Sequence, residues 1–347
     1  MSSREITELS NQVRPPESWV DQNVAWHYGD PLREQKNLVN GLGVVDLSNR
    51  GIIRISGDDR KKFLHSITSH HIERLNDGQS ETTLLLSQTG HIEHELHVIE
   101  KDQSLWLIVE ESSKQAVLDF LNKMIFMSRV EITDENKEFA VVFEPKRETD
   151  TNYPTWLTPE NYTGTPIKNA GQSAGGDPNR YVPVRPGIFL GRELIIKKTD
   201  LLDYLTNNGP VAGTWALEAL RIAAGVPRVI IDIDHKTIPH EVGLIGTAVH
   251  LEKGCYKGQE TIARVHNLGK PPRKLVLLHL DGSPNRLPNK GSAVVVDGDE
   301  VGLVGSSAQH YELGPIALAL IKAKTKVLLN VAVDEIPATI QDIVVGQ

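Results

Sequence analysis

The residues with the clearest capacity for chemistry stand in one octapeptide, Lys253-Gly254-Cys255-Tyr256-Lys257-Gly258-Gln259-Glu260. It holds the only cysteine of the chain, so neither an intramolecular disulfide nor a paired-cysteine zinc or redox site can form. Ammonium groups near a thiol favour the thiolate, which is its nucleophilic and metal-binding form. We therefore predict that Cys255 is reactive and assisted by Lys253, with a thiol pKa below the usual value of about 8.5.

Two observations bear on that prediction in opposite directions. A lone cysteine in an arbitrary protein is more often a buried structural residue, and lysines adjacent in sequence need not face the sulfur. The immediate neighbours of Cys255 are Lys, Gly and Tyr rather than aliphatic residues, and the two glycines allow close approach by a ligand. This environment favours an accessible thiol.

The octapeptide resembles the KGCYxGQE motif of the YgfZ family, and the match continues on both sides. Leu220-Arg221-Ile222-Ala223-Ala224-Gly225, then Asp232, Asp234 and Pro239-His240-Glu241, look like the family's LRxxAG and DxD…PxE run. Ala263 to Gly269 is similar to the form found in actinobacterial members, and Val45-Asp46-Leu47-Ser48 is shared with glycine-cleavage T-proteins. The resemblance covers nearly the whole chain apart from its N-terminal arm and the segment 144–186.

This resemblance implies a T-protein-like ring of two α+β, ferredoxin-like units around a central channel that binds tetrahydrofolate, followed by a C-terminal β-barrel. It also implies a role in assembling or repairing iron–sulfur clusters of client proteins, including enzymes that modify tRNA. Folate and the iron–sulfur client proteins are therefore the expected partners.

Three further residues correspond to the folate site of T-proteins. Reduced pterins present adjacent donors that a carboxylate accepts together, while Arg suits an acidic tail or anchors that carboxylate. The resemblance assigns Glu193, in Gly191-Arg192-Glu193, to the first role and Arg221 to the second. It assigns Glu95 to the position of the T-protein's catalytic Asp. Without the resemblance, Glu193 reads as an exposed strand charge, and Glu95 as part of a solvated strand face with Glu93 and His97.

The chain departs from the T-protein pattern at two of these positions. Ala223 replaces the Glu of LRxEAG, and Glu95 is one methylene longer than Asp. The longer side chain would displace a carboxylate that must reach the folate nitrogen. Both changes argue against aminomethyl transfer while leaving folate binding intact. A metal site at His91, His94 and His97 is not expected, because His94 points to the opposite face of a strand from the other two.

The elements that must position these residues divide the chain into three predicted regions. Residues 1–40 form an N-terminal arm, and residues 41–269 form the folate-binding region, whose two α+β units are joined by the loop-rich segment 144–186. Short β-type runs after Pro271-Pro272 predict a barrel over residues 270–347. Val44 to Leu47 and Ile52 to Ile55 read as paired strands, and His91 to Glu100 alternates as a strand. Ser112 and Gly213 are predicted to begin helices.

Composition limits the functional class. With 37 Lys and Arg against 45 Asp and Glu, the net charge is −8, which disfavours a dedicated nucleic-acid binder. There is no apolar run long enough for a membrane span and no signal-peptide pattern. We expect a cytoplasmic monomer that binds neither membrane nor nucleic acid directly. Three functions stay open: a folate-dependent iron–sulfur maintenance factor, a folate-dependent aminomethyltransferase or demethylase, and a folate-binding module without chemistry.

Overall fold

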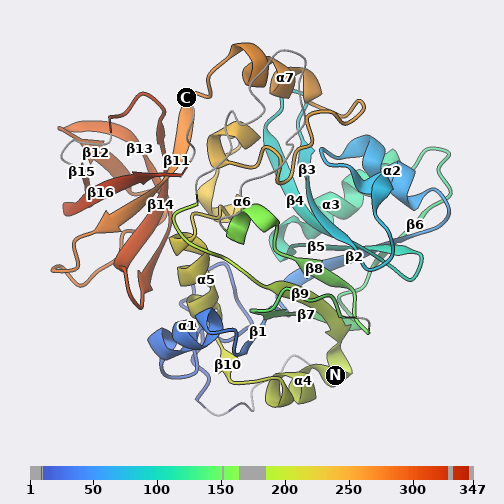
Figure 1. Ribbon diagram of the computed structural model, residues 1–347, viewed down its shortest axis with the longest axis horizontal. Helices are drawn as coiled ribbons and strands as arrows, with labels where there is room; N and C mark the ends of the chain where they lie inside the picture. Colours follow the sequence, from blue (N-terminus) through green and yellow to red (C-terminus); the bar gives the residue numbers. More distant parts are fainter. Residues whose placement is uncertain (1–8, 10, 151, 164–184, 327–330, 344–347) are drawn as a thin grey trace.

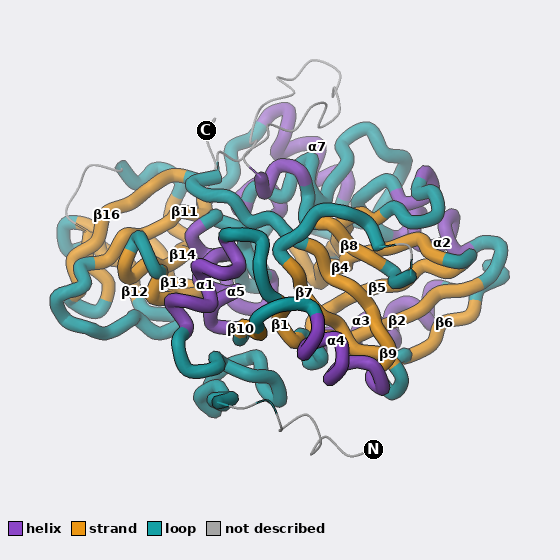
Figure 2. Tube along the Cα trace, turned by 60° about the horizontal axis from the view of Figure 1, so that its bottom comes forward, coloured by secondary structure: helices purple, strands orange, loops and turns teal. Residues whose placement is uncertain are grey.

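The computed structural model describes residues 9, 11–150, 152–163, 185–326 and 331–343. Two five-stranded sheets and a closed six-stranded barrel form its frame (Figure 1). The barrel lies at one end, the two sheets lie at the other, and helices α1 (Pro31–Val39) and α5 (Thr214–Ala223) lie between them (Figure 2). No helix among these residues has the length and apolar character that a bilayer crossing requires.

The first sheet has the strand order β3-β4-β5-β2-β6 and carries helices on one face. Its elements are β2 (Arg50–Ser56), α2 (Arg60–Ile67), η2 (Ile72–Arg74), β3 (Ser80–Leu86), β4 (Ile92–Lys101), β5 (Ser104–Glu110), α3 (Glu111–Met124) and β6 (Glu131–Asp134). Alternation along β4 sends Leu96 and Val98 into the core beneath α2 and α3. The same alternation sends Glu95 and His97 to the other face, where a central pocket lies.

The second sheet has the order β10-β1-β7-β9-β8 and packs against the first. Its elements are β1 (Val44–Asp46), β7 (Phe139–Glu144), β8 (Thr155–Leu157), β9 (Arg192–Lys197), η4 (Lys198–Asp200), α4 (Leu201–Asn207) and β10 (Val211–Ala212). Val141 and Ile195 face the first sheet, whereas Val142 and Leu194 pack against α4. The buried layer between the two sheets therefore continues to the pocket.

Strands β1 and β2 lie in different sheets, although the sequence predicts that they pair. β1 pairs with β7 and β10, and β2 pairs with β5 and β6. The Asp46 carboxylate accepts a hydrogen bond from the backbone N–H of Ser48 at 2.8 Å. This local turn redirects the chain from one sheet to the other, so the two α+β units are interleaved rather than sequential.

The segment after β10 connects the sheets to the barrel. It comprises α5, α6 (Val229–Asp232), η5 (Pro239–Val242) and α7 (Gln259–Leu268). As predicted, α5 begins at Gly213, which is its N-cap residue. Glycine is needed at this position because a Cβ would lie 2.2 Å from the Trp26 carbonyl oxygen. The barrel follows with β11 (Arg273–Leu280), β12 (Ala293–Val296), β13 (Asp299–His310), β14 (Gly314–Lys322), β15 (Val331–Val333) and β16 (Ile336–Asp342). Aliphatic side chains such as Val276, Val294 and Ile340 fill its interior.

The predicted N-terminal arm packs closely over most of its described length. Trp26 stacks on Trp215 of α5 with ring centroids 5.4 Å apart, and Trp19 meets Trp26 edge-on at 4.8 Å. The buried Glu34 carboxylate accepts hydrogen bonds from the backbone N–H groups of Tyr28 and Gly213. This segment therefore contributes to the central layer of the molecule.

Two other predicted segments are described in part. Within 144–186 the structure contains β8 and the 3₁₀ turn η3 (Glu160–Thr163), and residues 164–184 lie outside the described part of the chain. Residues 327–330 of the predicted Val327 to Val333 run do so as well. Ser112 does not cap α3. The helix begins at Glu111, and Glu110 is its N-cap residue. The domain boundaries at 40/41 and 269/270 stay predictions.

Candidate functional site

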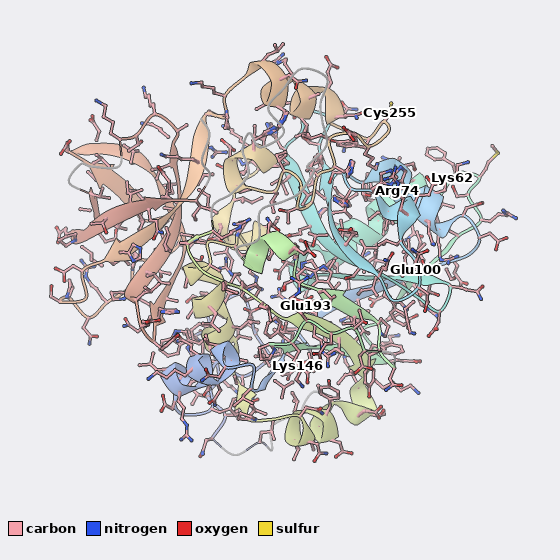
Figure 3. All side chains as sticks on the ribbon, in the orientation of Figure 1. Lys62, Arg74, Glu100, Lys146, Glu193 and Cys255 are labelled. Carbon is pink, nitrogen blue, oxygen red and sulfur yellow. The ribbon has the colours of Figure 1, made fainter. Side chains whose placement is uncertain are left out.

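A pocket lies between the two sheets and α5. It is lined by Arg50, Glu95, His97, Ile108, Val109, Glu110, Phe143, Trp156, Tyr162, Phe189, Glu193, Leu217, Glu218, Arg221, Val226, Pro227 and Arg228. Figure 3 places Glu193 near the centre of the molecule. The three residues assigned to folate from the sequence, Glu95, Glu193 and Arg221, thus line one pocket.

Glu95 projects into this pocket without a counter-charge of its own. Among the described residues, none hydrogen-bonds or ion-pairs with its carboxylate. Burial raises the pKa of Glu95, His97 opposes the rise, and the Glu110 and Glu193 carboxylates reinforce it. A carboxyl with a raised pKa in a pocket is a candidate for proton exchange with a bound ligand. Glu95 therefore lines a pocket as a partly buried side chain, and its role in ligand binding stays a prediction.

Glu193 faces Glu95 from β9 and is held by His97. The His97 Nδ1 lies 2.7 Å from Glu193 Oε2, and its ring stacks on Trp156 with centroids 3.6 Å apart and planes 3° from parallel. Burial opposes protonation of His97, but the Glu193 carboxylate outweighs it and raises the pKa of the imidazole. Only 7% of Glu193 is exposed, so this residue is not a surface charge.

Arg221 lies at the wall of the pocket and is fully engaged by protein groups. Its guanidinium donates to Glu218 Oε2 at 2.8 Å, to Asp232 Oδ2 at 2.8 Å and to Ser306 Oγ at 3.0 Å. It also donates to the Val226 carbonyl at 2.5 Å. The sequence-based expectation of a partnered, partly buried arginine agrees with this arrangement. The network leaves Arg221 as an anchor of the pocket wall.

A second buried network forms the neighbouring wall. Arg228 donates bidentately to Asp21, at 2.6 and 2.7 Å, and to Glu110, at 2.7 and 2.9 Å. Glu110 also pairs with Arg50. Burial alone would raise the pKa of Glu110, but Arg228 and Arg50 outweigh it and hold that pKa at about 2. Two of the pocket's three arginines are thus neutralised by carboxylates from distant parts of the chain.

Cys255 lies on an exposed loop outside the pocket lining. In Figure 3 it sits at the edge of the molecule beside α7, well away from Glu193. The Lys253 ammonium is buried and donates to the carbonyls of Thr68, at 2.5 Å, and His65 at the end of α2. Lys257 pairs with Glu93 at 3.4 Å. Both ammonium groups thus have partners other than the sulfur.

The remaining motif residues hold this loop. Tyr256 packs in the core between α5, α7 and the barrel. Gln259 donates to the Lys253 carbonyl at 3.0 Å, whereas Glu260 is exposed at the start of α7. Gly258 adopts φ +85° against Gly90 and Ser87, while Gly254 has open space around it. The octapeptide therefore combines a buried scaffold with one exposed thiol.

Metal binding finds no support in the described part of the chain. No group of three or more His, Cys, Asp or Glu side chains there could hold a metal ion. His97 faces the pocket and His94 does not, as the strand alternation predicts.

The chain is similar to several known proteins. Residues 15–143 match the family model of the GCVT N-terminal domain. A chloroplastic protein of Arabidopsis thaliana, named provisionally as a transferase, is 32% identical over 296 residues, which cover 80% of this chain and 66% of that protein. The aminomethyltransferase of Streptomyces coelicolor is 27% identical over 350 residues, which cover 92% of this chain and 91% of that protein. Residues 15–143 thus match a GCVT N-terminal domain, and over most of its length the chain is similar to aminomethyltransferases, or T-proteins.

A solved structure confirms the predicted fold. The glycine cleavage system aminomethyltransferase T from Bartonella henselae superposes with a TM-score of 0.74 at 18% identity, over 99% of this chain and 95% of that one. Similarity at this level of identity concerns the fold alone. The predicted T-protein architecture, two mixed α+β sheets followed by a β-barrel, is therefore correct.

Several pocket residues were not assigned from the sequence. His97 continues the alternation of Glu93 and Glu95 along the strand. The knowledge that this strand faces a cavity would be enough to identify His97 as a pocket residue. Trp156 and Arg228 stand in no recognisable motif, and neither does Asp21, which does not line the pocket but binds Arg228. They come together only through packing between segments up to 207 residues apart.

Proposed function

We propose that this T-protein-like chain binds a reduced folate in the central pocket and transfers a one-carbon unit to or from it, as an aminomethyltransferase-type enzyme. The observation that carries the proposal is the partly buried Glu95 carboxyl, which has no hydrogen-bond or ion-pair partner among the described residues, in a pocket bounded by Glu193 and His97. Similarity to T-proteins supports tetrahydrofolate as the ligand, and several relatives are named aminomethyltransferases.

The side chains of the pocket fit such a ligand. Aromatic and aliphatic groups, including Phe143, Trp156, Tyr162 and Phe189, supply surfaces for a flat ring. Glu193 offers the carboxylate oxygen that His97 does not occupy. Carboxylates bind adjacent N–H donors strongly when they are shielded from water. The pocket thus combines flat apolar walls with a small number of convergent polar groups, as ligand pockets usually do.

Glu95 is the residue that this proposal places at the reacting atoms. When folate is bound, its ring nitrogen supplies the atom that carries the one-carbon unit. Two C–N bonds to folate nitrogens would replace two N–H bonds while the bonds from the carbon to the lipoyl sulfur and to the amino group break. The Glu95 carboxylate would accept a released N–H proton and pass it to the departing thiolate or ammonia, which leave as thiol and ammonium. The raised pKa of Glu95 makes its carboxylate a better proton acceptor than that of an ordinary glutamate. This reading reverses the sequence-based expectation that the longer side chain argues against transfer.

The test replaces Glu95 by Gln, which preserves its volume and removes its proton. We expect affinity for 5-formyltetrahydrofolate within about threefold of the wild type, because the neutral amide keeps a hydrogen bond. We expect a loss of at least about 100-fold in methylenetetrahydrofolate formation from an aminomethylated lipoyl carrier. Glu93→Gln is the matched control, since Glu93 lies on the same strand, pairs with Lys257 and does not line the pocket. Full wild-type turnover in the Glu95→Gln variant would contradict the proposal.

A second function has one specific observation in its favour. The YgfZ-like motif displays Cys255 on an exposed loop that does not line the folate pocket. A thiol in this position would serve a partner protein rather than the pocket ligand. This supports a role for the chain in iron–sulfur cluster assembly or repair in client proteins, such as tRNA-modifying enzymes.

Complementation separates the two functions. Cys255→Ser changes one exposed atom, so the fold and folate affinity should be unchanged. If the iron–sulfur role holds, this variant should fail to rescue a strain that is deficient in iron–sulfur maintenance, at normal protein level. Full rescue would remove the thiol from the function, and rescue by Glu95→Gln but not by Cys255→Ser would favour the second function over the first.

A further inference from the structure

Four histidine rings gather outside the central pocket, beside the loop that carries Cys255. His65 belongs to α2, His70 and His71 follow that helix, and His250 precedes the Cys255 loop. Ring centroids lie 4.7 Å apart for His65 and His71, 5.5 Å apart for His71 and His250, and 5.7 Å apart for His70 and His250. The rings thus form a continuous cluster that the proposed folate chemistry does not use.

Lys253 connects this cluster to Cys255. Its backbone N–H donates to the His250 carbonyl at 3.2 Å, so a tight turn ends two residues before the thiol. Burial lowers the pKa of Lys253 to about 8, and the negative charge of the Cys255 thiolate opposes that shift. Burial also lowers the pKa of His71 and of His250, and the Lys253 ammonium lowers both further. The sulfur and the two rings are therefore within electrostatic reach of the same ammonium.

The hydrogen-bonding state of His71 and His250 follows from the burial of one nitrogen in each ring. Nδ1 is buried in both and has no hydrogen-bond partner in the described part of the chain, whereas Nε2 is not buried. Because the pKa of each ring is lowered, both are neutral at pH 7 and carry one proton. A buried N–H without an acceptor is costly, so that proton belongs on Nε2. Each ring therefore turns an N–H donor toward solvent.

His70 and Arg74 complete the surroundings of these donors. His70 is only 8% exposed, and no described residue hydrogen-bonds with its Nδ1, from which Glu81 Oε2 lies 3.6 Å away. Arg74 is exposed, and its guanidinium forms no ion pair with any residue that the structure describes. Its charge lowers the pKa of both His71 and His250, so it lies close to the two rings. Together these three residues offer donors and a positive charge, which is the composition of an anion site.

We propose that His71, His250 and Arg74 form an oxyanion site that orients an acidic reactant at Cys255. The ligand is the carboxylate or phosphate group of the molecule that the thiol meets, held by the two Nε2–H donors and the guanidinium. Arg74 and Cys255 lie at the same end of the molecule, away from Glu193 (Figure 3). The site goes beyond the proposed folate function, because it serves the exposed thiol rather than the central pocket, and it can be tested without folate.

A bound oxyanion should change the protonation of His71 and His250. The charged and titratable groups around the two rings are Arg74, Lys253, Glu73, Glu252, His65 and His70. Burial, Arg74 and Lys253 disfavour the imidazolium forms and outweigh the two glutamates, which favour them. An oxyanion adds negative charge and raises the pKa of both rings. Binding should therefore take up protons and strengthen as the pH falls from 8 to 6.

Iodoacetate and iodoacetamide make a matched pair of probes for this site. With either reagent the Cys255 thiolate displaces iodide and forms an S–C bond, so the thiolate fraction affects both rates alike. Only iodoacetate carries a carboxylate. We expect the ratio of the iodoacetate rate to the iodoacetamide rate at pH 7 to be at least about fivefold higher in the folded wild type than in the urea-unfolded chain. The ratio should rise further at pH 6. This arm needs no substitution.

Arg74→Gln supplies the second arm, because it removes the charge at an exposed position and should leave the fold intact. It should lower the rate ratio by at least about threefold. Arg129→Gln is the matched control, since Arg129 is also exposed but pairs with Asp58 and Asp59, each at 3.2 Å. A wild-type ratio no higher than that of the unfolded chain, or equal ratios in the two variants, would overturn the inference.

Competition identifies the group that the site prefers. Sodium phosphate and sodium acetate, each compared with sodium chloride at equal ionic strength, should slow iodoacetate at least about twofold more than iodoacetamide. The stronger competitor shows whether a phosphate or a carboxylate is the better ligand. If neither anion inhibits more than chloride does, the charges act only through the general field of the surface, and the proposed site is wrong.

Discussion

Asp21 belongs to none of the motifs, yet it binds Arg228, which lines the pocket. Only 1% of it is exposed, and it receives both terminal nitrogens of Arg228 at 2.6 and 2.7 Å. Asn49 donates to the same carboxylate at 2.6 Å. Burial alone would raise the pKa of Asp21, but Arg228 outweighs burial and holds it well below its usual range. A charged pair so fully enclosed is costly to break by removing one member.

Asp21→Asn should therefore destabilise the protein by on the order of 3 kcal/mol, because Arg228 loses one of its two carboxylate partners in a buried environment. Denaturant unfolding at pH 7 measures this change. Asp58→Asn is the control, since Asp58 pairs with Arg129 on the exposed surface at 3.2 Å, and such a pair contributes little. Equal unfolding midpoints for the two variants would contradict the assigned role of Asp21.

The same residue predicts a pH dependence with a definite sign. Its pKa is lower in the folded protein than the value of about 3.9 expected in the unfolded chain. Its stabilising contribution is therefore present in full above about pH 5 and is lost as the pH falls further. The difference in unfolding free energy between wild type and Asp21→Asn should stay constant from pH 8 to 5 and shrink below about pH 4. A difference that grows on acidification would have the wrong sign.

At the scale of elements, the loop between η5 and α7 depends on one of its two motif glycines. Gly258 has φ +85°, and a Cβ there would lie 2.6 Å from the Ser87 carbonyl oxygen and 2.9 Å from Gly90 Cα. Gly254 has no neighbour within 4 Å and no such backbone constraint. The motif alone does not distinguish the two glycines, whereas the structure shows that only Gly258 is constrained. Gly258 joins the Cys255 loop to the β3–β4 turn, and Gly254 only exposes the thiol.

We expect Gly258→Ala to destabilise the protein by about 1–3 kcal/mol, through left-handed strain and contact with backbone atoms. Gly254→Ala should change stability by less than about 0.5 kcal/mol. Thermal unfolding of both variants measures the effect, and alkylation of Cys255 reports the loop itself. The thiol should remain accessible in Gly254→Ala. Similar losses in the two variants would show that the assigned difference between them is mistaken.

The elements also show what could be learned before the structure. The octapeptide and the positions of Glu95, Glu193 and Arg221 were assigned through family resemblance, and the structure brings the last three to one pocket. Strand alternation was sufficient to place Glu95 and His97 on one face. The direction of the Lys253 side chain was not predictable, because it depends on carbonyls at the end of α2, 185 or more residues away. The pairing of β1 with β7 and β10 was not predictable either, because these strands are also far apart in the sequence.

At the scale of the whole molecule, the barrel is connected to the pocket through α5 and α6. Ser306 of β13 donates to Asp232 Oδ1 at 2.6 Å and accepts from Arg221 at 3.0 Å. Arg221 lines the pocket, so one hydrogen-bonded group spans the barrel, both helices and the pocket wall. Each member is buried, and such networks lose more than a single bond when one contact is displaced. The position of the barrel should therefore influence ligand binding although no barrel residue lines the pocket.

Gly305→Ala tests this connection without touching a charged group. A Cβ at Gly305 would lie 2.4 Å from Asp232 Oδ1 and 2.6 Å from Asp232 Cα, so the barrel and α6 must separate. Folate affinity should fall by about tenfold or more as Asp232 and Arg221 shift. Gly282→Ala is the control, because Pro315 lies 3.6 Å away in ordinary contact. Calorimetric unfolding with and without 5-formyltetrahydrofolate measures both effects, since a bound ligand raises the transition temperature by an amount that grows with the logarithm of its affinity. The ligand-induced rise should be present in the wild type and in Gly282→Ala but reduced in Gly305→Ala. An undiminished rise in Gly305→Ala would mean that the barrel does not influence the pocket.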